Sequence, residues 1–357
     1  MGGQSNCGLT APHPDSTEPG GTLRTQPAGR PGTGPGSARI GRRPGRGGLI
    51  RGRQALSGKP RDNAAVRTEG RGAIAVLHPG EMGAAVGRCL TGAGHMVLWA
   101  SQGRGSATTA RAGAAGLADA GSIEELAGRA DVILSICPPH AALDVARAVP
   151  GFGGTYVDAN AISPATSREV ARVIENGGAS YVDGGIIGAP PVTAGTTRLY
   201  LSGPRAGPVR DLFAGSPLDA RVVPGQRTAA SAVKMAYAAW TKGSAALVLA
   251  VRALARAEGV EPELLAEWAL SQPRLQARSV RGAGSAGAKG WRWAGEMEEI
   301  AASMTGAGLP GGFHQAAAEI FGRAPRLGPA ATDDEALDAI LAALGPSQAD
   351  DRPVAAG

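Results

Sequence analysis

The stretch AIAVLHPGEMGAAVGRCLTGAGHMVLWA, residues 73–100, decides the predicted fold. Residues 74–77 form a short apolar run, which is typical of a strand buried on both faces of a parallel sheet. A glycine turn follows, and Met82, Val86 and Leu90 then recur at the spacing of one helix face. Residues 96–99 resume a strand. This order predicts the first half of a dinucleotide-binding βαβ unit.

The glycine turn departs from the full fingerprint. The pattern Gly-x-Gly-x-x-Gly is met at Gly80 and Gly83, but its first position is His78. The alternative is a similar turn in another kind of α/β protein, but the strands on both sides favour a dinucleotide site. The helix-start amides and the positive end of the helix dipole would hold a pyrophosphate there. The predicted cofactor contacts in the turn are His78, Pro79, Gly80, Glu81, Met82 and Gly83.

The end of the second strand indicates which nicotinamide cofactor is bound. NAD usually meets a carboxylate there, which binds the ribose hydroxyl, but no Asp or Glu lies between Glu81 and Asp119. Ser101 and Arg104, with Arg111 further on, supply a hydroxyl and guanidinium groups that suit a 2′-phosphate. We therefore predict NADP rather than NAD. The alternative is that Arg104 is simply an exposed loop residue.

Two further predicted strands end in residues that would face the same crevice, because ligands bind at the carboxyl ends of parallel strands. Ile136, Cys137 and Pro138 are predicted to line the nicotinamide side. Cys137 is predicted to be a wall residue rather than a nucleophile, since no base lies beside it in sequence. Asn160 follows the next strand and is predicted to hold the nicotinamide or the substrate, or merely to cap a turn.

Local signals place other elements. Ser122 begins a capping box that predicts a helix start, and Ser163 followed by Pro164 predicts another. Residues 180–195 are predicted to be a strand that leads into a loop dense in Gly and Pro, which lets the backbone approach a small ligand closely. Gly188 in this loop is a predicted substrate contact.

The second half of the chain is predicted to be helical. Residues 227–258 are apolar on nearly all sides, so this helix must be buried in a helical domain or an oligomer interface. Lys234 lies in it, and an unpaired buried ammonium is costly. Lys242 is a second candidate; either lysine could instead extend its amine from the helix edge into solvent. Further helices are predicted at 261–270, 289–306, 313–321 and 333–344.

Composition limits the classes of protein. The net charge of +6 arises in the first 72 residues, which contain 12 Lys and Arg and 4 Asp and Glu. The remaining residues contain 24 Lys and Arg and 26 Asp and Glu, so they are nearly neutral. Residues 1–71 are predicted to be a disordered basic leader, and nucleic-acid binding through it is the least favoured hypothesis. No apolar run of about 18 residues predicts a membrane span. Three cysteines without a pairing pattern predict no metal site and a cytoplasmic protein.

The glycine turn, the predicted strand end Asp158-Ala-Asn160-x-x-Ser163-Pro164 and Lys234, in this order, resemble the β-hydroxyacid dehydrogenase superfamily. This superfamily includes 6-phosphogluconate and 3-hydroxyisobutyrate dehydrogenases and, more distantly, imine reductases. Four segments indicate one branch of it: LHPGEMGAAVG (77–87), VKMAYAAWTKGSAAL (233–247), KGWRWAGEMEEIA (289–301) and GLPGGFHQAAAEIF (308–321). The chain most resembles the branch that joins a 6-phosphogluconate dehydrogenase-like NAD-binding domain to a C-terminal domain of unknown function (DUF1932-like).

The resemblance implies an α/β Rossmann domain followed by an all-α domain like the C-terminal domain of 6-phosphogluconate dehydrogenase. The predicted boundaries are 1–71 for the leader, 72–225 for the NADP-binding domain, 226–328 for the helical substrate and dimerisation domain, and 329–357 for a C-terminal helix and tail. The resemblance also implies a homodimer through the helices. It makes Lys234 the general acid/base, because hydride transfer needs a proton partner at the substrate heteroatom.

Departures from the family pattern point to a different substrate. Tyr237 and Ala238 stand where the family has an asparagine, and Ile187 stands where its substrate loop has a carboxylate-binding serine. The family's lysine-aspartate-leucine motif is missing near 296–300. Tyr237 and Trp240 are therefore predicted contacts of a less polar substrate. The prediction is an NADP(H)-dependent oxidoreductase acting on a small alcohol or carbonyl compound; the alternatives are imine reduction and a catalytically inactive NADP-binding protein.

Overall fold

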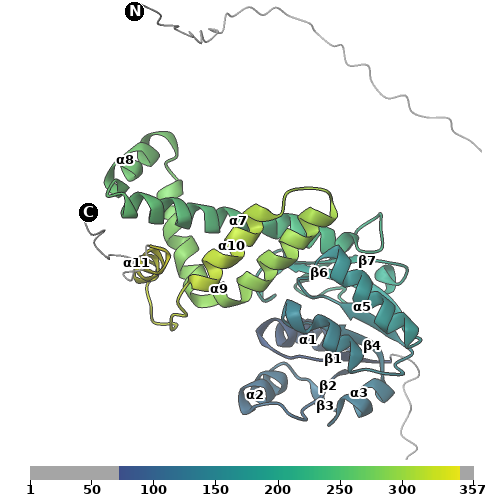
Figure 1. The fold of residues 1–357 in the computed structure, drawn as a ribbon. Coiled ribbons are helices and arrows are strands. Elements are labelled where there is room, and N and C mark those ends of the chain that lie inside the picture. The colour runs from purple at the N-terminus through teal and green to yellow at the C-terminus, as the bar shows by residue number, and fades with distance from the viewer. Residues whose placement is uncertain (1–71, 346–357) are drawn as a thin grey trace, which may run out of the picture. The chain divides into compact units, whose positions relative to one another are not determined.

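The computed structural model describes residues 72–345, so the predicted leader and the end of the predicted tail lie outside the described residues. Residues 73–222 form an α/β half built on one sheet with the strand order β3-β2-β1-β4-β5-β6-β7-β8 (Figure 1). All neighbouring strands are parallel except β6 and β7. The strands are β1 (Ala73–Val76), β2 (Val97–Trp99), β3 (Ala118–Asp119), β4 (Ala130–Ser135), β5 (Thr155–Asp158), β6 (Ser180–Ile187), β7 (Thr197–Ser202) and β8 (Leu218–Val222). The helices between them are α1 (Glu81–Gly92), α2 (Ser106–Ala114), α3 (Ile123–Arg129), the 3-10 turn η1 (Pro139–Ala141), α4 (Ala142–Arg147), α5 (Pro164–Asn176) and α6 (Ala206–Asp211).

Helices cover both faces of the sheet, which explains why its strands are continuous apolar runs. Ile74 of β1 belongs to the core on one face, together with Leu90 of α1. Its neighbour Ala75 belongs to the core on the other face, with Leu126 of α3 and Val170 of α5. Successive strand side chains therefore enter opposite cores. The predicted Rossmann-type architecture is confirmed.

Both predicted helix starts in this half are confirmed by their caps. The Ser122 side chain accepts a hydrogen bond from the Glu125 amide at 3.1 Å, and the Glu125 carboxylate accepts one from the Ser122 amide at 3.0 Å. This is the capping box that the sequence predicts at α3. Ser163 caps α5 through the amide of Thr166 at 3.1 Å, and Pro164 is the first helical residue.

The second half is entirely helical, as predicted. It contains α7 (Ala229–Ala257), α8 (Glu261–Ser271), α9 (Leu275–Gly306), α10 (Gly312–Arg323) and α11 (Asp333–Leu344). A third core joins them, with Leu249 of α7, Met297 of α9, Phe321 of α10 and Ile340 of α11 among its members. Helix α11 thus packs against α7 and α9 and shares their core (Figure 1).

Helix α9 starts much earlier than residue 289, where its prediction began. The preceding segment is rich in glycine, which usually indicates a loop, but close packing requires glycine there. A Cβ on Gly284 would lie 1.8 Å from Asp333 Oδ1, and a Cβ on Gly287 would lie 2.9 Å from Leu327 Cδ1. Tertiary contacts with the start of α11 and with the segment before it therefore outweigh the low helix propensity of these glycines.

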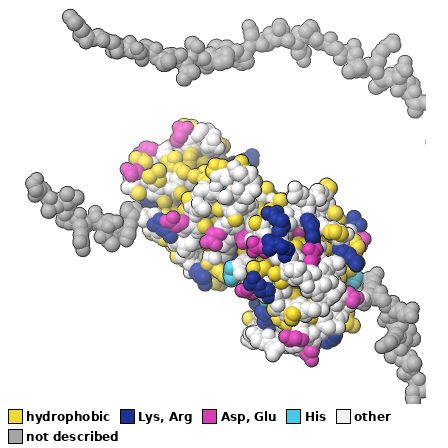
Figure 2. Space-filling model, turned by 45° about the vertical axis from the view of Figure 1, so that its right-hand side comes forward, with side chains coloured by type: hydrophobic (Ala, Val, Ile, Leu, Met, Phe, Trp, Pro, Cys, Tyr) yellow, Lys and Arg dark blue, Asp and Glu magenta, His cyan; other side chains and the backbone are white. Residues whose placement is uncertain are grey.

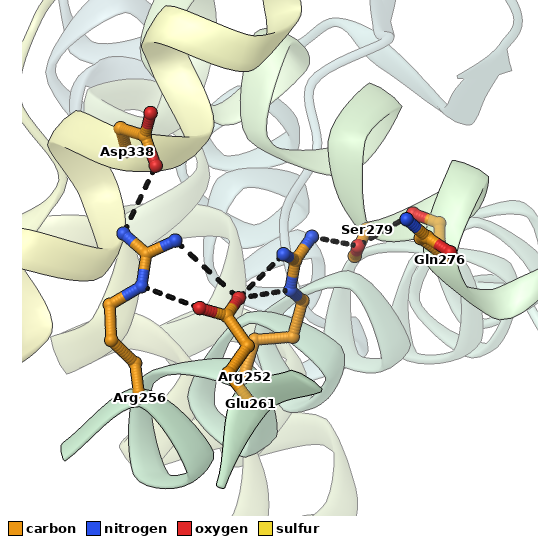
Figure 3. A network of polar contacts seen from close by, with 6 residues as sticks. All are labelled: Arg252, Arg256, Glu261, Gln276, Ser279 and Asp338. Atoms are coloured by element: carbon orange, nitrogen blue, oxygen red, sulfur yellow. Dashed lines mark hydrogen bonds and ion pairs between the residues drawn. The ribbon is translucent and has the colours of Figure 1, made fainter. Parts of the chain in front are cut away.

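A polar network ties α8 to the other helices (Figure 3). Arg252 of α7 is buried, and its guanidinium donates to the Glu261 carboxylate of α8 at 2.5 and 3.0 Å and to Ser279 Oγ of α9 at 2.9 Å. Arg256 donates to the same carboxylate at 2.8 Å and to Asp338 of α11 at 3.0 Å. The Glu261 carboxylate of α8 thus binds the guanidinium groups of Arg252 and Arg256, and these bonds set the position of α8.

Large hydrophobic side chains are exposed on and beside α8. Leu254 of α7 is 62% exposed and Leu270 of α8 is 83% exposed, with the exposed Val260 between the two helices. Figure 2 shows hydrophobic side chains gathered over this region. An exposed group of this kind is typical of a surface that another molecule covers.

None of the helices within residues 72–345 is long and apolar enough to cross a membrane. The same part of the chain contains no group of three or more His, Cys, Asp or Glu side chains arranged to hold a metal ion.

Candidate active site

A cleft of about 410 Å³ lies between the carboxyl ends of the sheet strands and the helices α7 and α9. This is where ligands bind in open α/β sheets. The sheet side comes from the start of α1 and the ends of β4, β5 and β6, and consists of Glu81, Met82, Ile136, Cys137, Ala159, Asn160, Ala161, Ile186, Ile187, Gly188, Ala189 and Pro190. The helical side consists of Lys234, Tyr237, Ala238, Thr241, Lys242, Lys289, Arg292, Trp293 and Glu296.

The glycine turn fits a phosphate-bearing cofactor. Gly80 is the N-cap of α1 and provides no side-chain cap, so the first amides of the helix are open to an incoming anion. A Cβ on Gly80 would meet nothing within 4 Å, which leaves room for a ligand against the backbone. At Gly83, by contrast, a Cβ would lie 2.1 Å from the His78 carbonyl oxygen. Only glycine therefore lets the first turn of α1 approach the backbone of His78 this closely.

His78 is half-buried in this turn, and its Nδ1 has no hydrogen-bond partner among the described residues. Burial, with a contribution from the charge of Arg104, lowers the pKa of His78 to about 4. The imidazole is therefore neutral near pH 7. Its unpartnered nitrogen is a polar atom that a bound ligand can satisfy.

The residues predicted to distinguish NADP from NAD lie at the end of β2, outside the cleft. Arg111 of α2 reaches back to the glycine turn, where its Nε donates to the Pro79 carbonyl oxygen at 3.4 Å. The structure also brings Asp119 of β3 beside Ser101, whose hydroxyl lowers the pKa of that carboxyl by hydrogen bonding. The structure therefore places a carboxylate next to the end of β2, although the residues that directly follow β2 in the sequence include no Asp or Glu.

Asn160 joins the ends of two strands. Its Oδ1 accepts from the Cys137 amide at 2.6 Å, its Nδ2 donates to Ser135 Oγ at 3.1 Å, and its own amide donates to Asp158 Oδ1 at 3.0 Å. The two side-chain bonds use one of the two donor hydrogens and one of the two acceptor lone pairs of the Asn160 amide group. Asn160 therefore shapes the wall of the cleft.

Cys137 lies beside Asn160 in this wall. Burial, together with the charge of Asp158, raises the pKa of the Cys137 thiol to about 12. The thiolate required of a nucleophile is therefore disfavoured near neutral pH, which supports the predicted role as a wall residue.

Lys234 enters the cleft because β6 and α7 pack closely. A Cβ on Gly185 of β6 would lie 2.9 Å from both the Ala230 carbonyl oxygen and Lys234 Cβ. Earlier in the same strand, the buried carboxylate of Asp183 accepts from the Ser231 amide at 2.8 Å and from Ser231 Oγ at 2.5 Å. Asp183 thus holds the first turn of α7 against the sheet, which sets the position of Lys234.

Lys242 lies two turns further along α7. Its ammonium forms an ion pair with Glu296 of α9, and both side chains are largely buried. The ammonium also lies 5.3 Å from the ring centroid of Trp293. Burial lowers the pKa of Lys242 to about 8, although Glu296 opposes the shift.

The cleft brings together many of the predicted site residues and leaves others outside. Those that line it are Glu81, Met82, Ile136, Cys137, Asn160, Gly188, Lys234 and Tyr237. Those outside the lining are His78, Pro79, Gly80 and Gly83 of the adjoining turn, Ser101 and Arg104 after β2, and Pro138. Trp240 also lies outside; it is 68% exposed, and the Arg278 guanidinium lies 5.5 Å from its ring centroid.

Sequence reasoning missed the contribution of α9 to the cleft. Lys289, Arg292, Trp293 and Glu296 follow one another at intervals that place them on a single helix face. The spacing was visible in the sequence, but nothing in it showed that this face meets the ends of the sheet strands.

Comparison with known protein families gives two matches along the chain. Residues 73–207 match the NAD-binding domain of 6-phosphogluconate dehydrogenase, and residues 255–324 match a domain of unknown function, DUF1932. No curated protein matches the chain.

Several solved structures are similar over nearly their whole length. A conserved hypothetical protein from Sinorhizobium meliloti 1021 has 23% identity and a TM-score of 0.59, with 77% of this chain and 96% of that one covered. The conserved protein MTH1747, described as structurally similar to 3-hydroxyacid dehydrogenases, has 25% identity and a TM-score of 0.55, with 76% and 99% covered. A 3-hydroxyisobutyrate dehydrogenase from Mycobacterium tuberculosis has 20% identity and a TM-score of 0.53, also with 76% and 99% covered.

Proposed function

Since the chain belongs to the NAD(P)-dependent oxidoreductases of the β-hydroxyacid dehydrogenase superfamily, in the branch that carries DUF1932, we propose a specific reaction for it. The protein transfers hydride between NADP(H) and a small alcohol or carbonyl compound, with Lys234 as the general acid/base. One observation carries this proposal: the start of α1 after the glycine turn and Lys234 of α7 line the same cleft.

The chain's own residues handle the proton in this reaction. The bound cofactor supplies or accepts the hydride, and a group of the protein must then exchange a proton with the substrate oxygen. Lys234 is half-buried in the cleft, and no Asp or Glu within residues 72–345 forms an ion pair with its amine. The amine is therefore available to a substrate heteroatom. Ile136 and Cys137 form part of the wall of the same cleft.

We propose NADP as the cofactor because guanidinium groups lie near the end of β2. Arg104 follows that strand, and Arg111 is held beside the glycine turn by its bond to Pro79. NAD is the second candidate, because the Asp119 carboxylate beside Ser101 can bind a ribose hydroxyl. Fluorescence titration of the purified protein with NADPH and with NADH tests this choice. Tighter binding of NADPH supports the proposal, and binding of neither at micromolar concentrations overturns it.

Replacing Lys234 tests its role. We expect Lys234→Ala to lower turnover by roughly 10²- to 10⁴-fold, the usual contribution of a general acid/base, and to leave the affinity for NADPH unchanged. Lys234→Arg keeps the positive charge but cannot release a proton near neutral pH, so it should be equally inactive. The measurement is NADPH oxidation with a panel of carbonyl compounds and imines, and NADP reduction with the corresponding alcohols.

The same panel separates the alternatives. Turnover of imines alone would favour imine reduction, and tight NADPH binding without any turnover would favour a cofactor-binding protein without catalysis. Unchanged turnover in Lys234→Ala would remove Lys234 as the acid/base.

We also propose a homodimer formed through the helical half. The support is the exposed group of hydrophobic side chains at Leu254, Val260 and Leu270, which another copy of the chain would cover.

A further inference from the structure

His78 stands in the cofactor turn at the position that the full fingerprint gives to glycine. Its carbonyl oxygen accepts a hydrogen bond from the Gly80 amide at 2.8 Å, and the same oxygen leaves no room for a Cβ on Gly83. The backbone of His78 is therefore part of the tight turn itself. The imidazole is thus carried at the edge of the site where the start of α1 is open to an anion.

Two guanidinium groups lie beside the same turn. The charge of Arg104, which follows β2, acts on the His78 imidazole. Arg111 of α2 donates to the carbonyl oxygen of Pro79, the residue next to His78. Within residues 72–345, neither arginine forms an ion pair with an Asp or Glu. Together with the positive end of the α1 dipole, they make this side of the turn electropositive.

The free protein keeps His78 neutral near pH 7. Burial is the larger cause of its pKa of about 4, and the charge of Arg104 adds to the effect. The other ionisable side chains on the elements around the turn are Glu81 of α1, Arg111 of α2, Asp119 of β3 and Cys137 after β4. Neither carboxylate among them counteracts the lowering of the pKa of His78 appreciably. The Nδ1 atom also has no hydrogen-bond partner among the described residues.

Both causes of the low pKa weaken when the imidazole faces a phosphate. A hydrogen bond from the ring to a phosphate oxygen replaces the hydration lost on burial, and the negative charge offsets that of Arg104. For opposite unit charges about 4 Å apart at an effective dielectric constant of about 20, the interaction corresponds to a rise in pKa of roughly 3. Protonation also makes both ring nitrogens donors, so that Nδ1 gains a hydrogen to share.

We propose that His78 is a proton-linked ligand of the cofactor: on binding, its imidazole takes up one proton from solvent and, together with Arg104, binds a phosphate group of the dinucleotide. This inference rests on the proposed function and deepens it, because it gives a role to the residue that replaces the fingerprint glycine. The phosphate group is either the 2′-phosphate of NADP or the pyrophosphate that NADP and NAD share, and comparing the two cofactors distinguishes these sources.

Calorimetric titration with NADP, in two buffers of different ionisation enthalpy, counts the protons taken up on binding and needs no substrate. The comparison is between proteins, because the 2′-phosphate itself titrates near about pH 6. At about pH 6.5 we expect the wild-type protein to take up roughly half to one proton more than His78→Asn or His78→Gly. His78→Asn keeps a hydrogen-bond donor that does not titrate, and His78→Gly restores the fingerprint.

The affinity for NADP provides a second readout. Relative to the two His78 variants, the wild-type protein should gain about tenfold in affinity between about pH 8 and pH 6. His95→Asn is the matched control and should behave like the wild-type protein. His95 follows the opposite end of α1, where its Nε2 lies 2.9 Å from the Leu212 carbonyl oxygen.

The same titration with NAD identifies the phosphate group. A difference in proton uptake that is seen with NADP alone assigns His78 to the 2′-phosphate, and an equal difference with both cofactors assigns it to the pyrophosphate. Equal proton uptake by the wild-type protein and the His78 variants overturns the inference. Failure of the wild-type protein to bind either cofactor would instead overturn the proposed function.

Discussion

Asp158, at the end of β5, is a buried acid whose ionisation the fold opposes. Its Oδ1 accepts the Asn160 amide at 3.0 Å, but its Oδ2 has no partner among the described residues. Burial raises the pKa of Asp158 to about 7; the bond from Asn160 opposes the shift, and the charge of Asp183 adds to it. The folded state therefore favours the protonated form of Asp158.

Replacing Asp158 should show how much free energy of unfolding its ionisation removes as the pH rises. The folded pKa of about 7 lies above the unfolded value of about 3.9, so the stability that protonated Asp158 contributes is complete below about pH 4. It is lost as the pH rises through about 7. Asp158→Asn keeps the acceptor for Asn160 and cannot ionise. We expect the variant to gain on the order of 2–4 kcal/mol of unfolding free energy relative to wild type between about pH 4 and pH 8.

Urea unfolding at several pH values measures this difference. Asp144→Asn, which removes an exposed carboxylate paired with Arg147, is the control and should show no such trend. A difference between Asp158→Asn and wild type that does not depend on pH would contradict the prediction.

Among the secondary-structure elements, α9 connects the two halves of the described chain. Its Glu299 carboxylate accepts from the Ser163 amide at 2.6 Å and from Thr166 Oγ1 at 2.9 Å, so it caps α5 from another part of the chain. A carboxylate at a helix N-terminus is favourable, because the free amides and the helix dipole both attract it. The same helix contributes Lys289 and Arg292 to the cleft. Its position therefore governs the shape of the candidate site.

Helix α8 depends on the Glu261 carboxylate. Burial disfavours its ionised form, but the hydrogen bonds from Arg256 and Arg252 outweigh that effect and lower its pKa. We expect Glu261→Gln to destabilise the protein by roughly 3 kcal/mol, because it leaves the buried Arg252 guanidinium without its counter-charge. Asp338→Asn removes the exposed partner of Arg256 and should cost less than about 0.5 kcal/mol. Urea denaturation compares the two variants, and equal losses would refute the assignment of Glu261 as the central partner.

At the scale of the whole molecule, the exposed hydrophobic group beside α8 predicts self-association. We expect light scattering coupled to gel filtration to give the mass of a dimer. A double variant, Leu254→Glu with Leu270→Glu, should give the mass of a monomer, because it would bury two charges in the proposed interface. Leu309→Glu, at an exposed position between α9 and α10, is the matched control and should remain dimeric. A monomeric wild-type protein would contradict the proposal.

Much of the fold could be predicted from the sequence because its signals are local. The glycine turn of residues 73–100, the Ser122 and Ser163 caps and the long apolar segment containing α7 all led to the elements that the structure contains. The first half of α9 could not be predicted, because the glycines that weaken a helix in isolation are required by packing against Asp333 and Leu327.

The candidate site, too, could be predicted from the sequence only in part. The sequence by itself determined the α/β and helical halves and the glycine turn at Gly80 and Gly83, since each depends on the spacing of neighbouring residues. Spacing left Lys234 and Lys242 as equal candidates, and only the resemblance to the superfamily selected Lys234. Only the tertiary structure decided that Asp119 lies beside Ser101, that Trp240 is outside the cleft, and that α9 brings Lys289 and Arg292 into it. These placements depend on how elements far apart in the chain pack together, and residue spacing within one element carries no information about that packing.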